Sequence, residues 1–121
     1  MKFYYNGKLI RTSKSHTYTH AVIDVITGGC KGCRTSKETA EAIISTEVAH
    51  YERQVGNYEN AIKALQNGKS GYYAKDGRRT YYTKFSADST VERYKAWIEW
   101  NRDYINSIKA TWQVVELEAR A

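Results

Sequence analysis

Two long stretches of this sequence repeat apolar residues at alternating spacings of four and three, and this repeat constrains the fold more than any other feature. The first stretch lies between Thr35 and Gly68, and its repeat consists of Ile44, Val48, Tyr51, Val55, Tyr58, Ile62 and Leu65. The second begins at Ser89, and its repeat consists of Val91, Tyr94, Ile98, Asn101, Ile105, Ile108, Trp112 and Val115. Such spacing lines up one seam along one helix face. The sequence therefore predicts two long helices.

The ends of both helices carry typical signals. Thr35 with Glu38 and Ser89 with Glu92 have the spacing of capping boxes, and Gly68 is a typical residue just after a helix. Because the two seams match in length and period, we expect the helices to pack as an antiparallel pair.

The remaining segments read as strands. Asn6-Gly7 between two aromatic and aliphatic runs predicts a hairpin, and the β-branched run from His16 to Ile26 predicts a third strand that stops at Gly28-Gly29. Residues Tyr72 to Phe85 predict a second hairpin with Asp76-Gly77 as its turn. The expected fold class is α+β: a small antiparallel sheet of two hairpins plus a strand, with two long antiparallel helices, in the order β-β-β-α-β-β-α.

Length and composition indicate one domain, residues 1–121, because 121 residues suffice for a single compact core. No apolar run approaches the roughly 20 residues of a membrane span, and the first residues lack the apolar core of a signal peptide. We therefore expect a cytoplasmic protein, with Cys30 and Cys33 reduced.

Positive charge is concentrated in the predicted strands and loops. Residues 1–37 hold seven Lys and Arg against one acid, and residues 68–86 hold five against one, while both predicted helices are net acidic. A basic sheet surface favours an anionic partner, which is either a nucleic acid or a small phosphorylated ligand. The alternative is that the charge only keeps the protein in solution.

An additional aromatic stripe lies on the second helix. Trp97, Trp100 and Tyr104 are displaced by roughly 100° from the main seam. The stripe packs on the sheet, forms an interface between copies of the chain, or lines an aromatic ligand pocket, since monomers seldom expose large apolar patches without a use for them.

The segment from Gly28 to Ser36 is rich in glycine and precedes a helix. Its free backbone N–H groups, together with Lys31, Arg34 and Thr35, form a candidate anion site. The Cys30-Lys31-Gly32-Cys33 motif supplies only two thiolates where a structural zinc needs four ligands, so the spacing favours a plain loop over a metal site or a redox pair. We predict no metal and no cofactor.

Catalytic signatures are missing from the sequence. There is no Gly-x-Ser-x-Gly elbow and no His-Glu-x-x-His motif. His50 lies off the main seam and is expected at the surface. Asn101 interrupts an apolar seam, and it serves either to fix helix register or oligomeric state, or to place a hydrogen-bonding group in a pocket. The sequence therefore predicts a protein that is not an enzyme.

The first quarter of the chain resembles a known family. Tyr4-Tyr5-Asn6-Gly7-Lys8-Leu9-Ile10-Arg11-Thr12-Ser13-Lys14, followed by His16, Tyr18 and Ala21-Val22-Ile23, is similar to small phage proteins of the Thoeris anti-defence family. This resemblance implies a non-catalytic sponge that sequesters cyclic ADP-ribose isomers made by bacterial TIR enzymes, with the signal bound between protomers of an oligomer. Some members of the family also hold cyclic trinucleotides. The resemblance further implies aromatic stacking on the base, with Arg and Asn holding the phosphates and ribose.

Candidate ligand-binding residues follow from the chemistry of the sequence. Tyr82 or Phe85 would stack on adenine, and the polar contacts would come from Arg93 and Asn101 on the second helix and from Arg11 and Lys14 near the first hairpin. The second anion or nucleotide site would comprise Lys31, Arg34 and Thr35. The expected function is capture of a cyclic signalling nucleotide by a homo-oligomer, from a dimer up to a hexamer. The alternative is a small basic inhibitor that binds a host nucleoprotein or nucleic acid.

Overall fold

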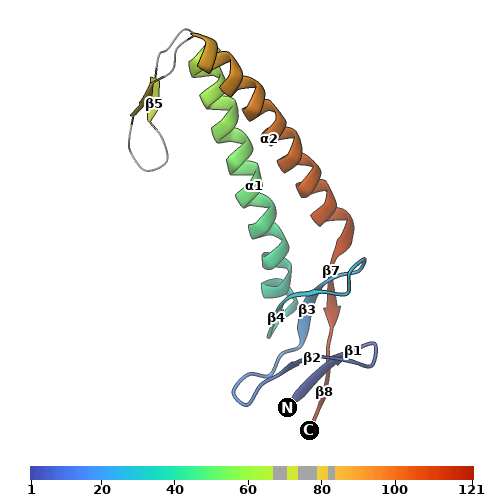
Figure 1. The fold of residues 1–121 in the computed structure, drawn as a ribbon. Coiled ribbons are helices and arrows are strands. Elements are labelled where there is room, and N and C mark those ends of the chain that lie inside the picture. The colour runs from blue at the N-terminus through green and yellow to red at the C-terminus, as the bar shows by residue number, and fades with distance from the viewer. Residues whose placement is uncertain (67–70, 74–78, 82–83) are drawn as a thin grey trace. The chain divides into compact units, whose positions relative to one another are not determined.

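The computed structural model describes residues 1–66, 71–73, 79–81 and 84–121, with the element order β1-β2-β3-β4-α1-β5-β6-α2-β7-β8 (Figure 1). Contacts divide the chain into two units: a sheet unit, Met1–Ala49 with Asn106–Ala121, and a helical unit, His50–Ile105. The predicted α+β class is confirmed, as is the predicted order of the two hairpins, the third strand and the two helices. The structure adds three strands, and it has two three-stranded sheets and a separate two-stranded one where one sheet was predicted.

The first sheet contains the predicted N-terminal hairpin. Its strands β1 (Lys2–Tyr5), β2 (Lys8–Thr12) and β8 (Glu118–Arg120) are antiparallel in the order β2-β1-β8. Asn6 and Gly7 have φ values of 49° and 77°. A two-residue turn with positive φ at both positions matches the twist of the strands it joins, so the hairpin prediction from Asn-Gly is confirmed.

The second sheet is built around β3 (His20–Asp24), which pairs antiparallel with β4 (Cys30–Arg34) and β7 (Trp112–Glu116). β3 is shorter than the predicted strand from His16 to Ile26, because side chains hold the backbone in turns at both ends. Ser13 Oγ accepts the N–H of His16 at 3.0 Å, and Asp24 Oδ1 accepts the N–H of Ile26 at 2.9 Å.

The glycine-rich segment is not a loop throughout, so the prediction for residues 28–36 is wrong over Cys30–Arg34. Gly28 has a φ of 78° and donates its N–H to the carbonyl of Asp24 at 2.7 Å, which closes a turn. The chain then pairs along β3. The residues of β4 have weak strand propensity, and the strand forms because pairing with β3 satisfies its backbone polar groups.

The second helix ends earlier than its seam predicts. α2 covers Lys84–Thr111, and Trp112 and Val115 belong to β7 rather than to the helix. Thr111 donates its hydroxyl to the carbonyl of Ser107 at 2.7 Å and accepts the N–H of Val25 at 2.9 Å. The β-branched pair Val114-Val115 favours a strand, and pairing with β3 prevails over the helical spacing of the seam.

The other helix limits also differ slightly from the predictions. α1 covers Lys37–Gln66, and its cap is Ser36, whose Oγ accepts the N–H of Thr39 at 3.2 Å, rather than Thr35. α2 begins five residues before Ser89, so Phe85 lies in this helix and not in the predicted strand. β5 (Gly71–Tyr73) and β6 (Arg79–Tyr81) confirm the paired strands of the second hairpin. Its predicted turn at Asp76-Gly77 lies outside the described residues.

Each unit has its own core. In the helical unit, α1 and α2 run side by side and antiparallel, as predicted, and their seams meet through Val55, Ile62, Leu65, Val91, Tyr94 and Ile98 (Figure 1). In the sheet unit, Phe3 is fully buried, and the apolar cluster consists of Ala21, Ile23, Cys33 and Val115, with Tyr5, Ile10 and Tyr18 packed against it.

A candidate aromatic binding groove

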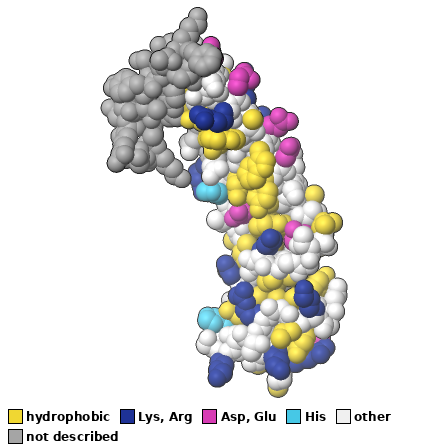
Figure 2. Space-filling view, viewed as in Figure 1, with side chains coloured by type: hydrophobic (Ala, Val, Ile, Leu, Met, Phe, Trp, Pro, Cys, Tyr) yellow, Lys and Arg dark blue, Asp and Glu magenta, His cyan; other side chains and the backbone are white. Residues whose placement is uncertain are grey.

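An open groove of about 370 Å³ lies between α1 and α2 in the helical unit. Its lining is aromatic and amide in character, and consists of Gln54, Tyr58, Trp97, Trp100 and Asn101. On the face shown in Figure 2, hydrophobic side chains run along the helices and charged groups border them. The groove therefore offers flat apolar walls with a few polar atoms, which is the usual character of a small-molecule site.

The walls of the groove belong to two groups of packed rings. Trp100 stacks on Tyr104 with ring centroids 5.6 Å apart and planes within 4°, and Tyr51 meets Tyr104 edge-on at 4.7 Å. The second group contains Tyr58, Tyr94 and Trp97, whose centroids are 5.3–5.5 Å apart. These contacts hold the rings in place before any ligand arrives.

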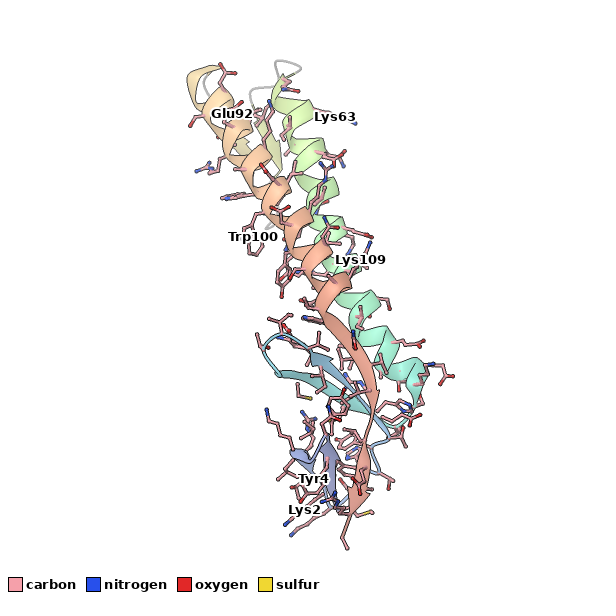
Figure 3. All side chains as sticks on the ribbon, turned by 90° about the vertical axis from the view of Figure 1, so that its right-hand side faces the viewer. Lys2, Tyr4, Lys63, Glu92, Trp100 and Lys109 are labelled. Carbon is pink, nitrogen blue, oxygen red and sulfur yellow. The ribbon has the colours of Figure 1, made fainter. Side chains whose placement is uncertain are left out.

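The two tryptophans of the groove remain exposed. Trp97 is 43% exposed and Trp100 is 59% exposed, and Trp100 projects outward from α2 in Figure 3. This exposure contradicts the explanation that the stripe is buried on a sheet. A ligand pocket and an interface between copies of the chain both remain consistent with exposed tryptophan faces.

Asn101 is the one groove residue with an unused buried polar atom. It is 2% exposed, and its Nδ2 donates to the carbonyl of Trp97 at 2.7 Å. This bond fixes the orientation of the amide, because only the nitrogen can donate to a carbonyl. Its Oδ1 has no hydrogen-bond partner among the described residues. A buried acceptor without a partner costs free energy, on the order of 1–3 kcal/mol, and so marks a place where a donor would be stabilising.

Charged and polar groups lie near the groove. The Arg93 guanidinium carbon lies 5.5 Å from the centroid of the Trp97 ring, and this contact keeps the cation beside the aromatic wall. His50 is exposed, as predicted, and its Nε2 lies 3.2 Å from Nε2 of Gln54, which holds the amide of this lining residue. The groove thus combines ring faces, amide groups and a cation.

The structure brings some of the predicted site residues together. Asn101 lines the groove and Arg93 packs on its wall. Arg11 and Lys14 are exposed in the sheet unit, where Arg11 is on β2 and Lys14 follows it. Tyr82 lies outside the described residues, as does the side chain of Phe85. The stacking role predicted for these two residues stays a prediction.

The second predicted site, Lys31, Arg34 and Thr35, lies on a strand and just after it rather than in the predicted loop. Lys31 and Arg34 are exposed on β4, and Thr35 follows that strand. Lys31 Nζ lies 5.1 Å from the centroid of the Trp112 ring, and Arg34 donates to the carbonyl of Cys33 at 2.7 Å. Cys30–Arg34 therefore form an edge strand that pairs with β3 on one side, rather than a loop, while the cations remain at its surface.

Two cysteines occupy β4 and face the apolar cluster of the sheet unit. Their Sγ atoms are 3.9 Å apart, and neither is in a disulfide. Cys33 is 1% exposed. Burial, followed by the charge of Cys30, raises the pKa of Cys33 from 9.0 to about 11, so this thiol is neutral at physiological pH. Among the described residues, no three His, Cys, Asp or Glu side chains are grouped as metal ligands would be.

We predict that the protein loses stability between pH 9 and pH 11 partly through Cys33. Because the folded state favours the neutral thiol, this stabilisation is complete below pH 9 and disappears as pH rises through 11, with an upper limit of about 2–3 kcal/mol. Urea unfolding at pH 8 and pH 10.5 measures the loss, and Cys33→Ala should show a smaller one. Equal losses in Cys33→Ala and in the unmodified protein would contradict the assignment.

Sequence reasoning missed part of the groove. Gln54 has no distinctive motif, and Tyr51 and Tyr58 were assigned only to the helix seam. The available signal was their spacing, since Gln54 follows Tyr51 by three residues and precedes Tyr58 by four, which places all three on one helix face.

Searches with the chain find no matching protein family model, curated protein or solved structure. In the part of the chain that the structure describes, neither helix is apolar enough over a sufficient length to cross a membrane.

Proposed function

We propose that this protein binds a cyclic signalling nucleotide and holds it chemically unchanged, with a base of the nucleotide in the aromatic groove. The observation that carries the proposal is the buried Asn101 Oδ1, an acceptor without a described partner, beside the exposed rings of Trp97 and Trp100. A nucleobase can bind to both features, because its flat face can stack on the tryptophan rings and the N–H groups on its edge can donate to Asn101 Oδ1.

The surrounding groups fit the rest of such a ligand. Asn101 Oδ1 is buried in the free protein, so a base reaches it when the ring of Trp97 or Trp100 moves aside from its packed position. Both rings lie at the surface, outside the core cluster of the two helices, so this movement leaves the core intact. Arg93 is exposed beside Trp97 and is placed to pair with a phosphate. The base and the phosphate would thus be bound by neighbouring residues of α2.

The resemblance of the first quarter of the chain to the Thoeris anti-defence family selects the ligands to test first. It favours cyclic ADP-ribose isomers as the first ligands to test and cyclic oligonucleotides as the second. In that setting the protein would be encoded by a phage and would act in the host cytosol by removing a defence signal.

Binding without reaction is supported by the lining of the groove. The described side chains that line the groove include no carboxylate, histidine, cysteine or lysine, which are the groups that most often transfer protons in general acid–base catalysis. The groove as described is suited to holding a ligand by stacking and hydrogen bonds.

We further propose that the working form is a homo-oligomer. The groove is open, and the exposed faces of Trp97 and Trp100 cover a ligand from one side only. A second copy of the chain would cover the other side and slow release, as sequestration requires. The mass of the protein in solution, measured with and without ligand, tests the homo-oligomer proposal. A monomer that binds the nucleotide with full affinity would contradict the homo-oligomer and would leave the proposal of base binding in the groove unaffected.

The experiment that tests capture uses the purified protein and a mixed pool of cyclic ADP-ribose isomers and cyclic oligonucleotides. The complex is isolated by size and heated, and the released compounds are identified by mass spectrometry. We expect an intact cyclic nucleotide at a fixed molar ratio to protein. Recovery of a hydrolysed product would overturn binding without reaction, and recovery of no nucleotide would overturn capture.

A substitution at Asn101 separates a ligand-binding role from a structural one. Asn101→Leu removes the unpaired acceptor at similar volume, so we expect unfolding free energy to stay the same or rise by about 1 kcal/mol while nucleotide affinity falls about tenfold. Urea unfolding and equilibrium dialysis measure the two effects. A loss of stability or a change of oligomeric state with unchanged affinity would show that Asn101 serves packing instead.

A further inference from the structure

The sheet unit carries a line of exposed cations on two neighbouring strand edges. β2 is the edge strand of the first sheet and β4 is an edge strand of the second. β2 contributes Lys8 and Arg11, and β4 contributes Lys31 and Arg34, all with exposed side chains. We call these four residues the basic strip. On the face shown in Figure 2, Lys and Arg side chains gather over this unit and acidic ones are few.

Contacts between the two edges place the cations next to one another. Ile10 of β2 packs against the apolar cluster that contains Cys33 of β4, and Arg11, the next residue of β2, is close enough to Cys33 for this thiol to be the largest cause that raises the pKa of Arg11. Lys8 Nζ lies 3.9 Å from the point that a Cβ on Gly28 would occupy, just before β4. β2 and β4 are therefore close together, with Lys8 beside the turn that precedes β4 and Arg11 beside β4 itself. Arg11, predicted as part of one anion site, thus lies close to β4, the strand that carries Lys31 and Arg34 of the other predicted site.

The cations of the strip have no carboxylate partner in the part of the chain that the structure describes. Among the described residues, none of the four cations forms an ion pair with a carboxylate, and the ion pair of this unit joins Arg120 to Glu118. The nearby Asp24 carboxylate instead accepts backbone N–H groups of its own turn. Unpaired cations in a row produce a positive potential that attracts an anionic chain.

Aromatic rings hold two of these cations. The Arg11 guanidinium carbon lies 5.8 Å from the centroid of the Tyr18 ring, and Lys31 lies over Trp112. Tyr18 also stacks on His16 with centroids 5.4 Å apart and planes within 5°. An alternative explanation for the cations is that charged residues on edge strands prevent sheets of different molecules from pairing. That explanation accounts for the cations but not for the aromatic rings beside them. Rings interleaved with cations are the composition of surfaces that bind single-stranded nucleic acid.

We propose that the basic strip binds single-stranded nucleic acid, with its four cations on phosphates and with a base stacked on the exposed ring of His16, which would extend the stack of His16 on Tyr18. This surface belongs to the sheet unit, and the proposal does not rest on nucleotide capture in the groove. It gives the protein a second binding activity, toward a polymer rather than a cyclic nucleotide.

The test measures the affinity of the full chain for a fluorescently labelled 20-nucleotide oligo(dT) at increasing salt. Four phosphate contacts predict a slope of about −3 in a plot of log affinity against log salt, and hence a loss of about 60-fold between 50 and 200 mM salt. Lys8→Gln with Arg11→Gln should reduce the steepness of this slope by about 1 to 1.5. The charge-matched control, Lys63→Gln with Lys109→Gln on the helices, should leave it unchanged.

Two further readouts locate the bound strand. Cys30 precedes Lys31 on β4 and is half-buried, so an oligo(dT) strand bound along the basic strip should slow the alkylation of Cys30 by iodoacetamide. An excess of cyclic nucleotide should leave oligo(dT) bound. The proposal is overturned if oligo(dT) fails to bind at 50 mM salt, or if both double variants change the slope equally. Displacement of oligo(dT) by the cyclic nucleotide would also overturn it, since the strip would then belong to the nucleotide site.

Discussion

Trp97→Ala is expected to weaken nucleotide binding by about 10-fold to 100-fold. Trp97 lines the groove, is 43% exposed, and contacts the rings of Tyr58 and Tyr94. Stacking of a base on an aromatic side chain contributes about 1–3 kcal/mol, and each 1.4 kcal/mol is a factor of ten in affinity. Equilibrium dialysis with the cyclic nucleotide recovered in the capture experiment measures the change.

Trp97→Phe and Trp112→Phe are the matched controls for this result. Phenylalanine at position 97 keeps a stacking face and should lose less than tenfold. Trp112 lies in the sheet unit, so Trp112→Phe should leave nucleotide affinity unchanged. Equal affinity in Trp97→Ala and the unmodified protein would place the base outside the groove.

Phe3→Ala is expected to have the largest effect on stability, with a loss of about 3–5 kcal/mol. Phe3 is fully buried in the sheet unit and meets the edge of Tyr18 with centroids 5.4 Å apart. Removal of its ring leaves a cavity and forfeits the burial of a large apolar surface. Urea unfolding followed by circular dichroism measures the loss.

A neighbouring strand supplies the control for this prediction. Leu9→Ala truncates an exposed apolar side chain on β2 and should cost less than about 0.5 kcal/mol. If Phe3→Ala fails to fold, Phe3→Leu provides a measurable intermediate loss. Similar small losses for Phe3→Ala and Leu9→Ala would contradict the burial of Phe3.

The sequence predicted the parts of the fold that depend on local pattern. The helix seams and the Asn6-Gly7 turn were predictable because spacing and turn chemistry act within a few residues. β4 and β7 were not, because their conformation depends on β3. Gly32 and Cys33 form a strand through pairing with β3, and Trp112 leaves its helical seam for the same reason.

The candidate site was predictable to a similar degree. The sequence indicates Asn101 as a candidate because a polar residue interrupts an otherwise apolar seam. It indicates Trp97 and Trp100 because one seam is enough for the two helices to pack, so a second aromatic stripe predicts another contact. The only sequence signal for Gln54 is its spacing from Tyr51 and Tyr58, and the fold places it in the groove lining with Trp97 and Trp100. The proximity of Arg11 to β4 also depends on how two sheets meet, and a single sequence contains no pattern for that.

The most direct test of nucleotide binding in the groove is a tryptophan fluorescence titration of the Trp112→Phe variant, which retains only Trp97 and Trp100. The titrant is a cyclic ADP-ribose isomer, with bound ligand determined in parallel by dialysis. A base stacked in the groove predicts saturable quenching with the same midpoint as binding. Binding by dialysis without a change in emission, or no binding at all, would contradict the central claim that this groove holds a nucleotide base.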